Sequence, residues 1–145
     1  MRRGGFTLLE LIVVLAILAG LTALVAPSFS RTVESARLRR AASDVRTTFA
    51  RTRALAVASA RERSAVFDLS RGEFGVDNEA VRILPDSVRL GAVLPGGDRL
   101  DRGSVRVRFF PDGGGEAAEI SVTADDGGAL RVTVDPLTGL AEAGT

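Results

Sequence analysis

The chain has 145 residues, and its 19 basic and 18 acidic residues give a formal net charge of +1. This length suits one small domain plus an anchor. The sequence contains no Cys, His, Lys, Tyr or Trp, so every basic residue is arginine. This composition excludes disulfides, thiolate or imidazole metal ligands, and the usual His, Cys or Lys catalysts, so we expect no enzyme and no cofactor.

A continuous apolar run extends from Phe6 to Ala26 and contains one charged residue, Glu10. As a helix rising about 1.5 Å per residue, this run would measure roughly 31 Å, enough to cross the hydrocarbon core of a bilayer. Arg2 and Arg3 stand immediately before it. Positive charge on that side favours a cytoplasmic N-terminus, with the rest of the chain across the membrane. The sequence therefore predicts a single transmembrane segment over residues 6–27.

Two simpler interpretations of the apolar run explain less. A cleaved signal peptide has a shorter apolar region followed by a small-x-small site, and Pro27-Ser28-Phe29-Ser30 is a poor site of that kind. A plain anchor leaves Glu10 unexplained, because a carboxylate at the centre of a span costs about 2.5–3.5 kcal/mol even on the lenient insertion scale. Glu10 is therefore interpreted as functional.

An amphipathic helix is predicted over residues 28–63. Pro27 removes one helical hydrogen bond, so we expect a kink there rather than an end to the helix. Beyond it, apolar residues recur at spacings of three to five, which indicates one apolar stripe. An alanine-rich stretch extends the helical expectation to about Arg63. The stripe residues are Phe29, Val33, Leu38, Ala42, Val45, Phe49, Thr52 and Ala56.

Residues 64–145 change to an alternating pattern that predicts antiparallel strands separated by turns rich in Gly, Pro and Asp. One long helix followed by such strands predicts an α+β fold in which the sheet packs on the helix stripe. The expected strands are 65–69 and 73–76 as a hairpin, 81–84, 88–90, 105–110, 120–123 paired with 130–134, and a short edge strand at 140–141.

Charged residues offer two kinds of candidate site. Asp98 with Asp101, and Asp125 with Asp126, stand beside glycines and are interpreted as turn residues rather than a calcium site. Four arginines of the helix have two open interpretations. They form either a solvated or inter-subunit face, which we favour, or a phosphate-binding stripe for DNA. These are Arg37, Arg39, Arg40 and Arg46.

The N-terminal sequence Gly5-Phe6-Thr7-Leu8-Leu9-Glu10 resembles the processing site of type IV prepilins and type II secretion pseudopilins. This resemblance implies that residues 1–5 are a leader, that a prepilin peptidase cuts between Gly5 and Phe6, and that Phe6 is then N-methylated. It also implies that Glu10 pairs with the N-terminal amine of a neighbouring subunit. The motif is specific because it joins a short basic leader, a glycine, a glutamate at the fifth mature position and an apolar run.

Three later segments narrow the resemblance to the minor pseudopilin H of type II secretion and the related minor pilin FimT. They are Arg51-Thr52-Arg53-Ala54-Leu55-Ala56, Phe110-Pro111-Asp112-Gly113 and Val134-Asp135-Pro136-Leu137-Thr138-Gly139. The resemblance implies a type IV pilin-like fold, with 64–145 as a periplasmic domain carried by an inner-membrane helix.

The function that this resemblance implies is structural. The chain would be a minor subunit of the tip region of a type II secretion pseudopilus, assisting protein export across the outer membrane. The alternative is a minor type IV pilin in pilus assembly or DNA uptake. Expected partners are other pseudopilins or pilins, the prepilin peptidase and methyltransferase, the inner-membrane assembly platform and membrane lipid, with DNA as the less favoured one.

Overall fold

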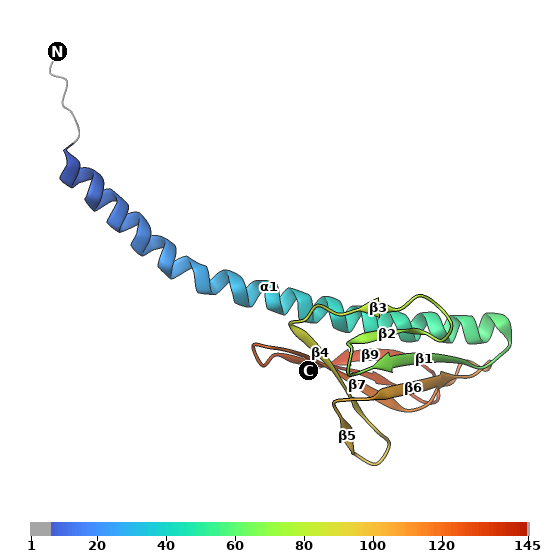
Figure 1. The fold of residues 1–145 in the computed structure, drawn as a ribbon. Coiled ribbons are helices and arrows are strands. Elements are labelled where there is room, and N and C mark those ends of the chain that lie inside the picture. Colours follow the sequence, from blue (N-terminus) through green and yellow to red (C-terminus); the bar gives the residue numbers. More distant parts are fainter. Residues whose placement is uncertain (1–6, 145) are drawn as a thin grey trace. The chain divides into compact units, whose positions relative to one another are not determined.

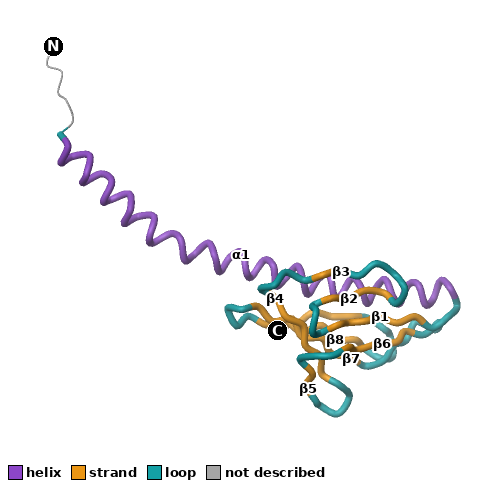
Figure 2. Tube along the Cα trace, viewed as in Figure 1, coloured by secondary structure: helices purple, strands orange, loops and turns teal. Residues whose placement is uncertain are grey.

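The computed structural model describes residues 7–144, without the side chains of residues 22–31. It contains one long helix and nine strands in the described part of the chain (Figures 1 and 2). Two units are distinguished, one ending at Val33 and one beginning at Glu34, and the helix contributes to both. The strands all belong to the second unit. All their pairings are antiparallel, which confirms the predicted α+β class.

Helix α1 extends from Leu8 to Ser59 and continues through Pro27. The kink expected at Pro27 stays a prediction. The expected extension of the helix to Arg63 is wrong, because the chain turns at Ala60, which has a φ of 49°. Ala60 N–H donates to the Val57 carbonyl and Arg61 N–H to the Ala56 carbonyl, the hydrogen-bond pair of a Schellman motif. This cap overrides the helix propensity of the alanine-rich stretch.

The strands form two sheets. The first sheet has the order β3-β2-β1-β6 and the second has the order β5-β4-β7-β8-β9. The strand bounds are β1 Arg63–Asp68, β2 Glu73–Val76, β3 Arg82–Ile83, β4 Val88–Val93, β5 Arg99–Leu100, β6 Ser104–Phe109, β7 Ala118–Ala124, β8 Ala129–Val134 and β9 Ala141–Gly144.

The predicted strand pairs hold where the alternating pattern was strong. β1 pairs with β2 and β7 with β8, as expected. The pairing of β6 with β1 was not predictable from local pattern, because their partners are about forty residues apart in the chain, as in Ala65 with Val107. Strand β5 was missed, since only two of its residues pair with β4.

The core of the second unit joins the helix to both sheets. Val45 and Phe49 of α1 are fully buried, and the Phe49 ring lies 5.2 Å from Phe67 and 5.9 Å from Phe109 between ring centroids. The second sheet contributes Ile120 and Val132, also fully buried. From Leu38 onward the helical stripe predicted from the sequence is therefore the surface on which this core is built, with Leu38, Ala42, Thr52 and Ala56 all buried along it. Val33 of the predicted stripe is exposed, and the side chain of Phe29 lies outside the described part.

Candidate functional site

The start of helix α1 is built by Thr7 and Glu10. The Thr7 carbonyl accepts a hydrogen bond from Leu11 N–H at 3.2 Å, and the Thr7 hydroxyl oxygen accepts one from Glu10 N–H at 3.2 Å. Thr7 is thus the N-cap residue and Glu10 occupies the third helical position, the spacing of a capping box. A carboxylate there also interacts favourably with the positive end of the helix dipole. The predicted processing pair, Gly5 and Phe6, lies outside the described residues.

Apart from Glu10, the side chains of the first helical turns are apolar on every side. Leu8 and Leu9 are about three quarters exposed in the isolated chain, at 77% and 73%, and the large apolar residues that follow as far as Leu21 are also exposed. A helix that is apolar all round needs surroundings that bury it. No described part of this chain covers these residues.

Within the part of the chain that the structure describes, no helix is both long and apolar enough to cross a membrane.

The four candidate arginines of α1 lie on two flanks of the helix rather than on one stripe. At about 100° per residue, Arg37 and Arg40 fall on one side of the buried stripe, and Arg39 and Arg46 fall on the other. All four are exposed. Arg37 already donates to the Ser87 hydroxyl at 3.4 Å, beside the β3–β4 connection. A single phosphate-binding track along this helix would need these side chains on one face, so the geometry favours separate surfaces.

The flank that carries Arg37 is tied to the β2–β3 region by ion pairs. Asp44 accepts from Arg82 at 2.7 Å, and Arg51 pairs with Glu79 at 2.8 Å. All four side chains are at least one third exposed, and such pairs contribute about 0–1 kcal/mol each. These ion pairs orient the β2–β3 region on the helix more than they stabilise the fold.

Arg53 on the opposite flank brings three distant segments together. Its Nε donates at 2.9 Å to the carbonyl of Gly113, after β6, and at 2.9 Å to the carbonyl of Thr138, between β8 and β9. Gly115 N–H donates to the Pro136 carbonyl at 3.1 Å and closes the same contact. We call this cluster the Arg53 junction. Its three segments are the ones that the sequence singled out around Arg53, Pro111 and Pro136.

Asp135 organises the turn that presents Thr138 to Arg53. Its carboxylate accepts hydrogen bonds from Leu137 N–H, Thr138 N–H and the Thr138 hydroxyl at 2.8–3.0 Å. The backbone N–H of Thr138 contributes most to holding the pKa of Asp135 below its ordinary value, followed by the Thr138 hydroxyl. A charged Asp135 therefore stabilises the turn.

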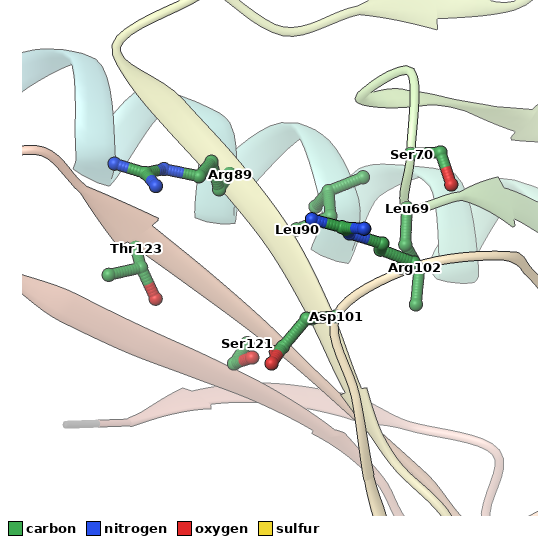
Figure 3. Close-up of a pocket in the computed structure, with 9 residues that line it drawn as sticks. Leu69, Ser70, Arg89, Leu90, Asp101, Arg102, Ser121 and Thr123 are labelled. Carbon is green, nitrogen blue, oxygen red and sulfur yellow. The ribbon is translucent and has the colours of Figure 1, made fainter.

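A cavity with a volume of about 580 Å³ lies on the outer face of the second sheet (Figure 3). Gly91 forms part of its wall, since a Cβ added there would lie 2.6 Å from the Ser121 hydroxyl oxygen. Figure 3 shows the Ser121 hydroxyl and the Asp101 carboxylate pointing toward one another. Arg89 is directed away and pairs with Asp125. The polar groups that line the cavity include the Ser121 hydroxyl, the Asp101 carboxylate and the Arg102 guanidinium.

Of the paired carboxylates of the sequence, Asp125 and Asp126 act in an ion pair and a turn. Asp126 accepts from Gly128 N–H at 2.9 Å, as expected for a turn residue, and Asp125 holds Arg89. No group of three acidic side chains able to hold a metal ion occurs among residues 7–144. Asp98 and Asp101 are exposed beside β5.

Two family models match separate parts of the chain. Residues 1–26 match the model of the prokaryotic N-terminal methylation motif. Residues 41–138 match the model of the type II transport protein GspH. The chain belongs to the GspH family. No curated protein and no solved structure matches it significantly.

The GspH match begins on the buried stripe of α1 and ends at Thr138, so it contains the whole Arg53 junction. Membership of the GspH family makes the chain a type II secretion minor pseudopilin in general terms, with a pilin-like α+β fold. At family level, GspH is a structural pseudopilin subunit rather than an enzyme. The methylation motif adds prepilin peptidase cleavage and N-methylation.

Proposed function

We propose that this GspH-family chain is a minor pseudopilin of the tip region of the type II secretion pseudopilus, where it helps to export folded proteins across the outer membrane. The observation that carries the proposal is the match of residues 41–138 to GspH, together with the methylation motif over residues 1–26.

The proposed arrangement has a cytoplasmic N-terminus, an inner-membrane helix over residues 6–27 and a periplasmic domain. Arg2 and Arg3 before the apolar run support this orientation. The all-round apolar surface from Leu8 to Leu21 supports a helix that is buried by lipid before assembly and by neighbouring helices afterwards. Partners in this proposal are the other pseudopilins, the prepilin peptidase and methyltransferase, and the inner-membrane assembly platform.

Processing is tested by the intact mass of the chain isolated from membranes. We expect a mature chain that begins at Phe6 and carries one added methyl group. Gly5→Leu should block cleavage because it places a large side chain at the scissile bond, whereas Gly4→Leu, one residue earlier, should be processed. A chain that retains Met1, or a chain cut beyond Ala26, would contradict the proposal.

The tip position requires a separate measurement, because processing alone does not locate a subunit. Filaments obtained by overproducing the major pseudopilin can be labelled with gold-conjugated antibody against residues 64–145. We expect label at one end of the filament. Label distributed along the whole length would show a different position while leaving the family assignment intact.

A further inference from the structure

Strand β6 is the last strand of the first sheet, and its outer edge is available for pairing. The direction of its backbone groups follows from β1. The Ser64 carbonyl accepts from Asp77 N–H toward β2, whereas Leu69 N–H donates to the Gly103 carbonyl toward β6, each at 2.8 Å. Odd-numbered residues of β1 therefore bond to β6. With Ala65 opposite Val107, the outward backbone groups of β6 belong to Ser104, Arg106 and Arg108.

One of these three residues, Arg108, already has partners. Glu116 N–H donates to the Arg108 carbonyl at 2.8 Å, and the Glu116 carboxylate accepts from Arg108 N–H at 3.0 Å. The segment then leaves β6 and enters β7. At Ser104 and Arg106, no described residue pairs with the outward N–H and C=O groups. These two residues therefore present unused backbone donors and acceptors.

A groove of about 310 Å³ lies beside the open part of this edge. Its walls come from the end of β4, from β6 and from the start of β7, and they are mainly apolar. They include Val93, Leu94, Val105, Ala118 and Ile120. An open strand edge beside an apolar groove is the combination that binds an added strand, since the edge supplies hydrogen bonds and the groove receives alternate side chains.

The other sheet edges offer less. β3 and β5 contain two residues each, so they can pair only briefly. β9 is the short strand Ala141–Gly144 and carries Glu142. β6 is six residues long. Among these terminal strands, the open part of β6 is the one that offers an added strand both backbone bonds and apolar contact.

Charge argues against a second copy of the same strand as the occupant. Two β6 edges paired about a two-fold axis at Arg106 or at Val105 would place the two Arg106 side chains opposite or diagonal to one another on the solvent face, which is unfavourable. Arg106 is 57% exposed and uses Nη1 to hold Asp77 at 2.8 Å. Its guanidinium has further donors for a second carboxylate. An acidic residue opposite Arg106 would be favoured.

We infer that the open edge of β6 at Ser104 and Arg106 binds an extended segment of another protein, with a carboxylate opposite Arg106 and an apolar neighbour in the groove. Successive side chains of a strand point to opposite faces, so one added strand satisfies both requirements at once. This inference does not depend on the tip position, because it concerns the second unit of the chain alone.

The first test uses the full chain, labelled with ¹⁵N in detergent micelles, and a capped peptide of sequence Asp-Val-Asp-Val-Asp. We expect saturating peptide to slow hydrogen exchange of the Arg106 amide by about tenfold or more, because that amide becomes hydrogen-bonded. The matched control, Arg-Val-Arg-Val-Arg, should slow it by less than about twofold. An unprotected Arg106 amide, or equal protection by both peptides, would overturn the inference.

The second test compares two variants that both lack the Arg106 guanidinium. Arg106→Pro also removes the outward N–H, which makes no bond inside the fold and is therefore a position that an edge strand tolerates. Arg106→Ala keeps the N–H. We expect the acidic peptide to bind the proline variant at least about tenfold more weakly than the alanine variant. Equal affinities would overturn the inference. Should the proline variant not fold, the exchange measurement on the unaltered chain still decides.

Discussion

Gly139 has a reason to be glycine that its sequence context alone does not show. Its φ is 63°, and a Cβ added there would lie 2.3 Å from the Gly113 carbonyl oxygen and 3.0 Å from the Arg53 side chain. Gly127 also has a positive φ, 87°, but a Cβ there would meet open space. Substitutions at these two positions therefore distinguish the cost of backbone strain alone from the cost of strain with a steric clash.

We predict that Gly139→Ala destabilises the chain by about 3 kcal/mol or more, since strain and overpacking add. Gly127→Ala should cost about 1 kcal/mol, from strain alone. Urea unfolding of the full chain in mild detergent, followed by circular dichroism because Trp and Tyr are absent, measures both. Equal losses would show that the approach to Gly113 is not tight.

Asp135 predicts a pH dependence. Hydrogen bonds from Thr138 hold the pKa of this carboxyl below its ordinary value. A group whose pKa is lower in the folded state stabilises the fold above its unfolded pKa, and this contribution is lost as the pH falls through the folded pKa. Asp135→Asn should therefore melt below the unaltered chain at pH 7, and the difference should shrink as the pH falls below about 4.

Thermal melts at neutral and acidic pH test this expectation. Asp98→Asn, in the turn between β4 and β5, is the matched control and should show a small difference at every pH. The pKa of Glu116 is also lowered, mainly by its hydrogen bond with Arg108, but Glu116 is present in every protein compared, so its titration cancels. A gap for Asp135→Asn that is constant with pH would contradict the assignment.

At the scale of elements, Arg53 connects the helix to two connections between strands. Arg53→Ala leaves the carbonyls of Gly113 and Thr138 without their donor, and we expect it to cost about 3 kcal/mol. Arg53→Lys should recover only part of this, because lysine has a methylene group where arginine has the Nε that donates both bonds. Arg39→Ala, an exposed position on the same flank, should stay within about 0.5 kcal/mol. Equal losses of unfolding free energy in Arg53→Ala and Arg39→Ala would show that the Arg53 junction does not stabilise the fold.

The predictability of these elements follows from the range of the interactions that build them. The stripe around Val45 and Phe49 and the hairpin of β7 with β8 were predictable, because local periodicity and turn residues define them. The helix end at Ala60 was not, since a Schellman cap usually has glycine or asparagine in the left-handed position. The Arg53 junction spans 60 and 85 residues of sequence, and no local pattern predicts such contacts.

The candidate site, too, could be predicted only where a local sequence pattern defines it. Glu10 is conspicuous as the one charge in an apolar run, and Thr7 three residues earlier is a sequence signature of a helix start. The arginines of α1 form one cluster in the sequence but two flanks on the helix. Counting charges in a segment does not reveal this division, whereas the angle of about 100° per residue does. The outer edge of β6 depends on strand order, which the sequence left open.

At the scale of the whole molecule, the chain combines one unit that has its own core and one whose apolar surface no described residue covers. The second unit buries residues of α1 and of both sheets together. The helix from Leu8 to Leu21 exposes its large apolar side chains. This division matches a subunit whose first unit is completed by other helices during assembly. If that proposal holds, Glu10 is the charged residue of the apolar run that would enter the helix bundle.

The last prediction concerns Glu10 and separates its charge from its place in the helix. Glu10 is in the first turn of α1, where a glutamate stabilises the helix start. Among packed apolar helices an unpaired carboxylate would be strongly disfavoured, and the N-terminal amine of a neighbouring subunit would provide a counter-charge. Glu10→Gln keeps the size and the capping position and removes the charge.

If pairing with an amine is the role of Glu10, Glu10→Gln should be processed and inserted normally but impair filament incorporation and secretion about as strongly as Glu10→Ala. Glu10→Asp should recover part of the function, because it is shorter but still charged. Incorporation is measured in sheared filaments, and processing by intact mass. If Glu10→Gln assembles like the unaltered chain while Glu10→Ala does not, the residue acts through capping and size, and the charge pairing is wrong.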